Sequence, residues 1–593
     1  MTRLFNEPDA FADEMIAGFA AANRRYVRPV PGGVVRATTS PAGQVAVVIG
    51  GGSGHYPAFG GLVGQGLAHG AAMGNLFASP ATQQVRSVAE AAQRGGGVLL
   101  SYGNYAGDVL NFDAAQEQLR AAGIPCETVT VTDDISSAPV SEQHRRRGIA
   151  GDLTVFRAAA AAAEAGADLA DVARVARLAN ERTRSFGVAF TGCTLPGADA
   201  PLFTVPEGRM AVGLGIHGEP GIDETEIPTA DELAERLVGD LLADAELPDG
   251  VDAPRGVRVV PILNGLGAVK YEELFVVYRR VAELLEEAGA EIVDPHVGEY
   301  CTSFDMAGCS LTLFWLDDEL AELWETPVDT PAYRRGSVVA APLEDVVEVA
   351  DAAADAIPDA TDASRDGARL VHRAVAAVSA TIDAHVDELG RMDAIAGDGD
   401  HGIGMQRGAH AALAAASVAL DAGAGAGTTL ARAGDAWSHR AGGTSGALWG
   451  LALREVGAAL GDEAAPTRDT VATGINAAVA GIRAYGRAEV GDKTMVDALV
   501  PFADALRREV DAGARLAVAW AAAADEASAA AAATAELLPR MGRARPHAER
   551  SLGTPDPGAH SFALIARAVA HVLAGEAGAT AAAPAADTKG TPA

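Results

Sequence analysis

Short runs of β-branched and aliphatic residues alternate with longer alanine-rich runs in the first half of the chain. The β-rich runs include QVAVVIG, which ends at Gly50, GGVLLSYG, which ends at Gly103, and ETVTVTDD, which begins at Glu127. A run with a helical period, RAAAAAAEAGADLADVARVARLA, begins at Arg157. Because alternating strands and helices usually pack as helices against a mostly parallel sheet, this pattern predicts an α/β fold.

A second α/β portion begins near Phe186. Its strand-like segments are RMAVGLGIHGEPG, from Arg209, and VRVVPILNGLG, from Val257. Both segments carry continuous apolar stretches bounded by glycine, which is typical of buried strands. We expect this portion to end near Asp317.

The pattern changes again after Thr326. Up to Asp366 the chain is rich in Pro, Ala and Asp and has no long apolar period, which predicts a linker. The following alanine-rich sequence has a helical period and hardly any β-branched run, which predicts an all-helical domain. The low-complexity end of the chain predicts disorder. The expected parts are an α/β portion at 1–325, a linker at 326–366, a helical domain at 367–575 and a disordered tail at 576–593.

Length and charge restrict the possible partners. A chain of 593 residues exceeds the size at which one core keeps growing, so two or more domains are expected. Asp and Glu total 79 against 46 Lys and Arg, which gives a net charge of -33. This charge repels nucleic-acid phosphates and anionic lipids, so we expect neither nucleic acid nor membrane as a partner. A phosphorylated ligand would need helix N-termini, glycine-rich backbone or a bound cation to receive it.

Cysteine usage and apolar runs predict a soluble cytoplasmic protein. The N-terminal sequence MTRLFNEPDAFADEM has no apolar core of the kind found in signal peptides. An apolar run at Leu516–Ala524 is far too short to cross a membrane. The few cysteines are widely spaced, which favours reduced thiols over disulfides or a metal clip; they are Cys126, Cys193, Cys301 and Cys309.

Three aspartates crowd the glycine-rich segment RMDAIAGDGDHGIGM. The spacing Asp393-x4-Asp398-x-Asp400 fits neither one face of a helix nor one face of a strand, so the carboxylates can converge only from a loop or a helix end. Converging carboxylates need a counter-charge, and hard oxygen ligands select Mg²⁺ or Ca²⁺. The spacing does not fit an EF-hand, which leaves Mg²⁺ on nucleotide phosphates. For a motif this short, a solvated acidic turn is the alternative interpretation.

Three further glycine-rich segments follow. In RAGGTSGALWG, Gly443 and Thr444 precede an apolar helix, as in an anion-binding helix N-terminus. The segment around GDKT is close to a phosphate-binding P-loop, but Asp492 precedes the lysine and the sequence before it is helical, so we reject that motif. The segment GRARPHAERSLGTPDPGAHS offers Arg543 for phosphate and a sharp turn at Asp556.

Taken together, DAIAGDGDHG, GGTSGALWG, GDKTMVD and ERSLGTPDPGA occur in the order found in the nucleotide-binding domain of the dihydroxyacetone kinase family. This resemblance covers nearly all of residues 367–575. The N-terminal portion, over about residues 5–325, resembles the ketose-binding domain of the same family through VVIGGGSGHYPAFGGLVG, NYAGDVLNFD, GIHGEPG and TSFDMAGCSLTLF. The resemblance implies two α/β subdomains followed by a helical barrel. The implied activity is ATP-dependent phosphorylation of the terminal hydroxyl group of dihydroxyacetone or an erythrulose.

The resemblance also assigns site residues in the helical domain. It implies two Mg²⁺ ions that bridge the ATP phosphates and are bound by Asp393, Asp398 and Asp400. The implied nucleotide-binding residues are His401, Gly402, Ile403, Gly404, Gly443, Thr444, Gly486, Met495, Arg543, Asp556, Pro557 and Gly558.

In the ketose domain, His217 follows a strand-like run and is surrounded by glycines, a setting that keeps its imidazole open to a ligand. A lone histidine is usually structural. The resemblance implies that His217 attacks the sugar carbonyl and forms a hemiaminal, that His55 and Asp108 are an acid/base pair, and that Gly52 and Ser53 line the sugar. Covalent attachment suits a three- or four-carbon sugar, which has few atoms for hydrogen bonding.

The chain departs from the family pattern in three places. The residue before NYAGD is commonly lysine, but here it is Gly103, and we expect the missing side chain to leave room for a larger sugar such as a four-carbon ketose. Tyr56 and Phe59 replace polar residues in GHYPAF. The run HGIGM is similar to versions found in tetrulose kinases and in subunits that hold ADP permanently for a phosphotransferase partner.

Two other functions remain alternatives at this stage. The helical domain of this family can also carry a lyase activity that cyclises FAD, and related domains serve as sugar-sensing regulators. Retention of three aspartates argues against a sensor, which needs no metal-loaded nucleotide site. We expect a homodimer, and a separate phosphotransferase partner is not excluded.

Overall fold

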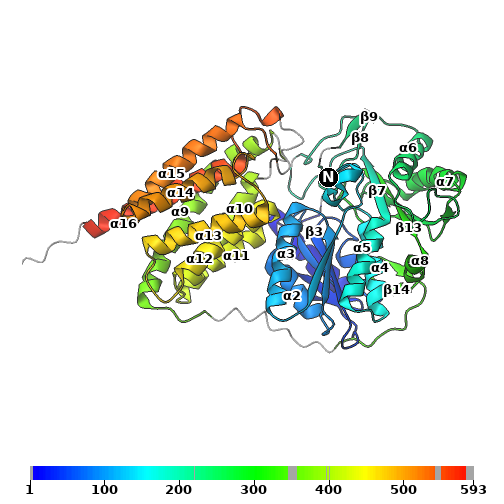
Figure 1. Ribbon diagram of the computed structural model, residues 1–593, viewed down its shortest axis with the longest axis horizontal. Helices are drawn as coiled ribbons and strands as arrows, with labels where there is room; N and C mark the ends of the chain where they lie inside the picture. The colour runs from blue at the N-terminus through cyan, green and yellow to red at the C-terminus, as the bar shows by residue number, and fades with distance from the viewer. Residues whose placement is uncertain are drawn as a thin grey trace, which may run out of the picture. The chain divides into compact units, whose positions relative to one another are not determined.

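The computed structural model divides the chain into two compact units, Met1–Ala354 and Asp355–Ala593, which we describe one at a time (Figure 1). The residues described are 4–198, 200–219, 221–344, 357–395, 397, 399, 401–540 and 549–581.

The first sheet of the N-terminal unit has six strands in the order β1-β2-β4-β3-β5-β6. β3 is parallel to β4 and β5, and β5 is parallel to β6, whereas β2 is antiparallel to β1 and β4. The strands are β1 (Val27–Val30), β2 (Gly33–Arg36), β3 (Ala46–Ser53), β4 (Gly70–Leu76), β5 (Val98–Gly103) and β6 (Cys126–Val131). The associated helices are η1 (Pro8–Ala10), α1 (Phe11–Ala22), η2 (Gly60–Leu62), α2 (Thr82–Ala92), α3 (Ala106–Ala121), η3 (Val140–Arg145), α4 (Asp152–Glu164) and α5 (Leu169–Glu181).

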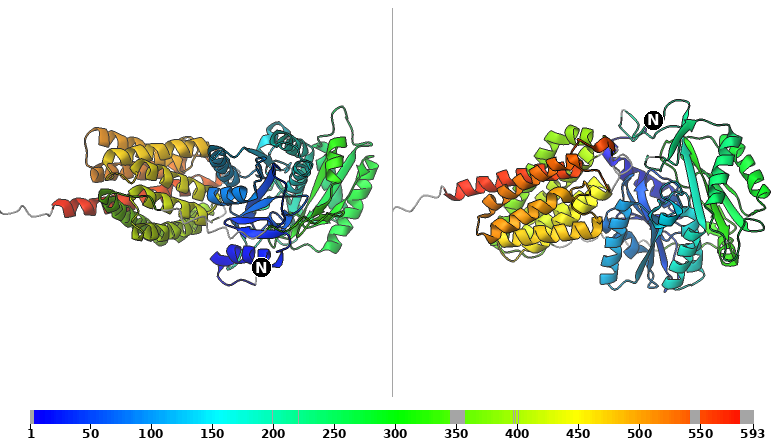
Figure 2. Two further views of the ribbon diagram at one scale, coloured as in Figure 1. Left: turned by 90° about the horizontal axis from the view of Figure 1, so that it is seen from below. Right: turned by 45° about the horizontal axis from the view of Figure 1, so that its top comes forward.

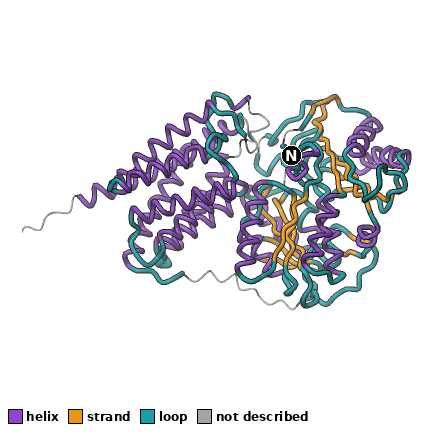
Figure 3. Tube along the Cα trace, in the orientation of Figure 1, coloured by secondary structure: helices purple, strands orange, loops and turns teal. Residues whose placement is uncertain are grey.

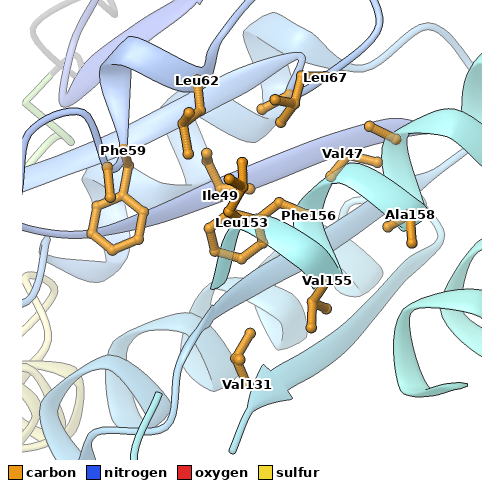
Figure 4. Packing of buried hydrophobic residues seen from close by; sticks show 14 of the residues in the cluster. Val47, Ile49, Phe59, Leu62, Leu67, Val131, Leu153, Val155, Phe156 and Ala158 are labelled. Atoms are coloured by element: carbon orange, nitrogen blue, oxygen red, sulfur yellow. The ribbon is translucent and has the colours of Figure 1, made fainter. Parts of the chain in front are cut away.

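The two faces of β3 are buried in different cores. Val47 and Ile49 pack with residues of α4 and α5, as Figure 4 shows for α4, whereas Ala46 and Val48 pack with α2 and α3. Alternate residues of a strand point to opposite faces, so a strand covered by helices on both sides must be apolar throughout. This accounts for the unbroken apolar run QVAVVIG and confirms the predicted α/β class.

The second sheet has seven strands and is mixed. The order is β11-β10-β13-β7-β8-β9, and β12 also pairs with β10. β13 is antiparallel to β10 and β7, whereas β11 and β12 run parallel to β10. The strands are β7 (Thr183–Ala189), β8 (Arg209–Val212), β9 (Asp223–Glu226), β10 (Arg258–Gly265), β11 (Glu291–Ile292), β12 (His296–Gly298) and β13 (Gly308–Leu316). The helices are α6 (Ala230–Ala243), α7 (Tyr271–Glu287) and α8 (Asp318–Trp324).

The two sheets share one core. Val260 and Ile262 of β10 and Phe314 of β13 pack in the same cluster as α4, while the opposite face of this sheet packs with α6 and α7. The N-terminal unit is therefore layered as α2 and α3, first sheet, α4 and α5, second sheet, and α6 and α7 (Figure 1). The two α/β subdomains expected from the sequence are confirmed.

The structure shortens the predicted linker at both ends. β14 (Val328–Asp329) pairs with β15 (Arg334–Arg335), and the Asp329 amide donates to the Gln65 carbonyl at 2.9 Å. Val328 and Tyr333 are buried, so the chain after 325 still belongs to the first unit. At the other end, Thr361 caps a helix that begins at Asp362. The Pro- and Ala-rich composition of this segment gave no sign in the sequence of these few buried positions.

The second unit consists of helices in the part that the structure describes (Figure 3). Each helix packs against the next, and α16 packs against α9, so the helices form a closed ring, as expected for a helical barrel (Figure 2). Inside it, the Trp449 ring stacks on those of Trp437 and Phe562, and Phe502 meets Phe562 edge to face. The helices are α9 (Asp362–Asp393), α10 (His401–Asp421), α11 (Ala426–Ala441), α12 (Gly443–Leu460), α13 (Arg468–Gly486), α14 (Val496–Asp511), α15 (Leu516–Ala533), η4 (Thr534–Glu536) and α16 (Pro557–Ala581).

One described helix is long and apolar enough, by length and composition, to cross a membrane. It is the stretch Pro557–Gly575 of α16, with a mean hydropathy of 1.2. Phe562, Ile565 and Ala566 of this helix pack in the core of the helical unit. A single helix of this kind is weak evidence for a membrane span, because core helices pass the same test. The predicted tail beyond Ala581 lies outside the described residues.

Candidate active site

The first candidate site lies at the carboxyl end of β3. The chain passes from β3 to β4 on one side, and β5 lies on the other side of β3, which makes this strand end a topological switch point where α/β proteins bind ligands. A Cβ added at Gly52 would lie 2.7 Å from the Ala78 amide nitrogen. Only glycine at this position therefore allows the loop after β4 to approach so closely. Ser53 donates its hydroxyl hydrogen to the Gly74 carbonyl at 2.6 Å.

His55 is fully enclosed directly after this strand. Its side chain is 1% exposed and stacks on Phe77, with ring centroids 4.9 Å apart. Its Nδ1 lies 2.8 Å from the Thr302 carbonyl, and its Nε2 lies 2.9 Å from Nε2 of His217. Burial, followed by the nearby His217, lowers the pKa of His55 to about 3.

His217 comes from the second sheet, in the turn after β8, and meets His55 edge to face. Its Nδ1 lies 2.9 Å from Glu219, which also accepts a bond from the His217 backbone amide at 3.1 Å. Ser303 donates its hydroxyl hydrogen to the Ile216 carbonyl beside His217. Because Thr302 binds His55 and Ser303 holds the His217 turn, one short segment fixes both rings.

Glu219 lies beside a partly buried ion pair. Nη1 of Arg147 lies 3.9 Å from the Glu219 carboxylate, and Nη2 lies 2.8 Å from Asp134. The line of groups therefore runs from Asp134 through Arg147 and Glu219 to the two histidines. Sequence reasoning missed Glu219 and Arg147, although Glu219 stands inside the quoted GIHGEPG motif.

The partners of the two rings assign their protons. The Thr302 carbonyl can only accept, so Nδ1 of His55 carries a hydrogen, and a carboxylate at Glu219 likewise requires a hydrogen on Nδ1 of His217. The two Nε2 atoms would then face each other with lone pairs unless one proton lies between them. A hydrogen bond between the two Nε2 atoms at 2.9 Å requires a proton between them, and burial, which lowers the pKa of His55, disfavours that proton on the His55 ring.

Asp108 completes this site from the first turn of α3. It is 8% exposed, and its Oδ1 has no hydrogen-bond partner among the described residues. Burial raises its pKa to about 7, although His217 and a hydrogen bond from Ser79 act in the opposite direction. A buried carboxyl group with a pKa near neutrality and a free oxygen is suited to accept a proton from a substrate.

Gly103 has close neighbours in the structure. A Cβ at Gly103 would lie 3.2 Å from both the Gly148 carbonyl oxygen and Cε2 of Tyr105, and the Tyr105 hydroxyl donates to the same carbonyl at 2.9 Å. The centroid of the Tyr105 ring lies 4.6 Å from that of the His217 ring. Since these contacts do not measure the sugar site, the expectation that Gly103 leaves room for a larger sugar stays a prediction. Tyr56 is half exposed, whereas Phe59 belongs to the core.

The second candidate site is one end of the helical ring. Consecutive helices pack side by side through short connections and therefore alternate in direction. The N-termini of α10, α12, α14 and α16 thus meet at one end, which attracts anions through the helix dipoles. The predicted nucleotide residues at this end are His401, Gly402, Ile403, Gly404, Gly443, Thr444, Gly486, Met495, Asp556, Pro557 and Gly558. Arg543 lies outside the described residues.

Acidic groups also gather at this end of the ring. Asp393 ends α9 and accepts from the Gly399 amide at 2.9 Å, and its charge raises the otherwise burial-lowered pKa of His401. Burial, together with the charges of the nearby Asp497 and Asp393, raises the pKa of Asp556 to about 7. Carboxylates that repel one another in this way fit a divalent cation with oxygen ligands. Asp398 and Asp400 lie outside the described residues.

Comparisons with known proteins follow the same division of the chain. Residues 17–332 match the Dak1 domain, and residues 395–571 match the DAK2 domain. The chain is 60% identical to L-erythrulose kinase from Pectobacterium atrosepticum, over 97% of each chain. It is 55% identical to D-erythrulose kinase from Mycolicibacterium smegmatis, over 96% of this chain and 98% of the relative.

A solved structure shares both units. It is the dihydroxyacetone kinase of C. freundii in complex with AMP-PNP and Mg²⁺, which is 31% identical, with a TM-score of 0.51, and covers 96% of this chain and 99% of its own. These matches agree with the resemblance read from the sequence motifs.

Gly402 is a packing residue of the helical unit. A Cβ at Gly402 would lie 2.2 Å from the backbone oxygen of Val386 on α9, whereas a Cβ at Gly404 would meet only the Ala441 carbonyl, at 3.7 Å. We expect Gly402→Ala to lower the free energy of unfolding by about 1–3 kcal/mol, because a rigid backbone must move. Gly404→Ala is the matched control and should be neutral or slightly stabilising. Chemical denaturation measures both, and equal effects of the two substitutions would contradict this interpretation.

Proposed function

This chain belongs to the dihydroxyacetone kinase family, and we propose that it transfers the γ-phosphoryl group of ATP to a terminal hydroxyl group of erythrulose, a four-carbon ketose. The two relatives named above support the acceptor, because they match almost the whole chain and are both named erythrulose kinases. Their names specify different enantiomers of erythrulose, so the proposal covers both enantiomers. Dihydroxyacetone is the shorter alternative acceptor.

The observation that carries the proposal is the contact between the two histidine Nε2 atoms. We propose that His217 hands the shared proton to His55, and that the freed Nε2 of His217 attacks the ketose carbonyl carbon. A carbon–nitrogen bond forms, the carbonyl π electrons move to oxygen, and His55 returns the proton to that oxygen. The product is a hemiaminal in which the His217 ring is an imidazolium, and the total charge is unchanged.

Glu219 gives this step its charge balance. The imidazolium keeps a hydrogen on Nδ1, which faces the Glu219 carboxylate at 2.9 Å. That carboxylate is already hydrogen-bonded to His217 and lies 3.9 Å from Arg147, which Asp134 orients, so the counter-charge is present before the sugar arrives. Attachment through Nε2 follows from the same geometry, since Nδ1 is already engaged.

Asp108 then serves as the base for phosphoryl transfer. Its free Oδ1 would accept the proton of the terminal hydroxyl group as that oxygen attacks the γ-phosphorus. In the helical unit, Asp393 with Asp398 and Asp400 would hold Mg²⁺ against the ATP phosphates, and the metal would neutralise charge on the transferred group. The N-termini of α10, α12, α14 and α16 would bind the remaining negative charge of the phosphates. A homodimer and a cytoplasmic location stay predictions of the sequence.

The first test is to measure which sugar accepts the phosphoryl group. Purified protein with Mg²⁺ and ATP is offered L-erythrulose, D-erythrulose, dihydroxyacetone, glyceraldehyde and glycerol, and ADP release is measured. We expect the highest kcat/KM with an erythrulose and no turnover of glycerol, which has no carbonyl for His217. His217→Ala should lower kcat/KM by at least about 100-fold, because attachment and orientation are both lost. The exposed His144→Ala is the control.

Two results would contradict the proposal: turnover of glycerol at a rate similar to the ketoses, or persistence of kinase activity in His217→Ala. If no sugar is phosphorylated, formation of a cyclic flavin phosphate from FAD tests the lyase alternative.

Glu219→Gln tests the counter-charge. Glutamine can still accept the Nδ1 hydrogen bond, but it lacks the charge that offsets the imidazolium. We expect kcat/KM for the ketose to fall by about 10- to 100-fold, in keeping with loss of a charged hydrogen bond, while KM for ATP stays unchanged. Glu224→Gln, on the exposed strand β9, is the matched control. An equal effect of both substitutions, or none of either, would show that the Glu219 charge plays no part.

The pKa of Asp108 predicts a pH profile. A base must be deprotonated to act, and burial raises the pKa of this carboxyl group to about 7, so kcat/KM should rise with pH up to about 7 and level off above it. An ordinary aspartate would place this limb near pH 4. Asp108→Asn should remove activity across the whole range. A flat wild-type profile between about pH 5.5 and 8 would contradict the assignment of Asp108 as the base.

A further inference from the structure

Lys493 is the residue that makes the segment GDKTMVD look like a phosphate-binding P-loop. The structure gives it a different setting, because the segment follows helix α13 rather than a strand. Its side chain is only 5% exposed, and its backbone is left-handed, with φ of 60°, which a residue with a Cβ seldom adopts. A buried lysine in an unusual backbone conformation requires a specific set of partners.

Those partners are two backbone carbonyls that lie far apart in sequence. Nζ of Lys493 donates to the Leu537 carbonyl at 3.1 Å and to the Ser551 carbonyl at 2.7 Å. Leu537 directly follows the end of η4, and Ser551 stands shortly before α16. One ammonium group therefore joins both ends of the connection between α15 and α16.

The loop that carries Lys493 is itself fixed. The Asp497 carboxylate accepts from the Gly491 amide at 2.6 Å and from the Thr494 amide at 2.7 Å. The Arg540 amide also donates to the Asp492 carbonyl at 3.1 Å. Lys493 therefore lies on a loop that is itself held by hydrogen bonds. Its two bonds to carbonyls fix where the Leu537 and Ser551 segments lie relative to this loop.

Both elements joined by Lys493 carry residues of the proposed nucleotide site. Met495 stands two residues after Lys493 at the start of α14, and Asp556 stands five residues after Ser551 at the start of α16. A Cβ added at Gly558 would lie 3.4 Å from Cβ of Met495, so the two helix starts are in contact range. The spacing between these helix starts therefore depends on the connection that Lys493 closes.

We infer that Lys493 is a positioning residue that holds the N-termini of α14 and α16 at the spacing the nucleotide site requires, and that it acts through Met495 and Asp556 rather than as a phosphate ligand. This inference rests on the proposed function for the role of the site. The hydrogen bonds that carry it are independent of that function.

Hydrogen exchange of the nucleotide-free full-length protein tests the inference first. In Lys493→Met, amides of 534–540 and 549–556 should lose protection by about tenfold or more, because both carbonyl contacts are gone. Lys493→Arg should restore most of this protection, since a guanidinium can donate to two carbonyls. The exposed Arg515→Met, at the opposite end of the helical ring, should change nothing in these segments. A phosphate ligand would leave protection unchanged in the absence of nucleotide, which would overturn the inference.

Steady-state kinetics supply the second measurement. KM for ATP should rise by about tenfold in Lys493→Met and return toward the wild-type value in Lys493→Arg, while KM for the ketose stays within about twofold. Loss of protection without any change in KM for ATP would reduce Lys493 to a purely structural residue and overturn the inference. If the wild-type protein phosphorylates no ketose, the proposed function fails, whereas the exchange result still decides whether Lys493 joins the two segments.

Discussion

The 2.9 Å contact between the Nε2 atoms of His55 and His217 is the constraint on which the first site depends. The two rings come from different sheets, so the contact exists only if the sheets keep one fixed relation. The shared core around α4 supplies that relation, because it packs against both sheets. The Thr302 carbonyl and the Glu219 carboxylate then fix the outer nitrogens, so the inner nitrogens must share a proton. The packing of the two sheets thereby sets up a hydrogen bond between two imidazole rings.

The helical unit reaches a similar result by different means. Alternating helices bring every second N-terminus to one end, where the dipoles favour negative charge, and the end of α9 brings Asp393 to the same place. The helix N-termini attract anions and the carboxylates attract cations. A nucleotide with a bound divalent cation carries both kinds of charge. This explains how a chain with a net charge of -33 can receive a polyphosphate through local features.

Periodicity in the sequence was sufficient for the fold, because buried strands such as β3 and long alanine-rich helices have strong patterns. The motifs also led to His55, His217 and Asp108. Arg147 could not be found this way, since its function depends on Asp134 and Glu219, which only the fold brings together. The effect of Gly103 on the sugar site is a similar case, because it depends on Gly148 and Tyr105, which the fold places beside it. Lys493 was set aside with the rejected motif, and its carbonyl partners lie more than forty residues away.

Both units contain a buried carboxyl group at the candidate site whose pKa is raised to about 7, Asp108 in the first unit and Asp556 in the second. A carboxyl group whose pKa is raised from about 3.8 to about 7 destabilises the fold when it is ionised. This cost is absent below the pKa of the unfolded state and grows as the pH rises toward 7, to the order of 4 kcal/mol for each group. A protein retains such groups where a ligand relieves the cost. In the proposed mechanism the proton of the substrate hydroxyl group would relieve this cost at Asp108, and a cation held with the neighbouring aspartates would relieve it at Asp556. Near neutral pH both groups therefore stand close to the midpoint of their titration, where a small change in charge at the site shifts each one most strongly.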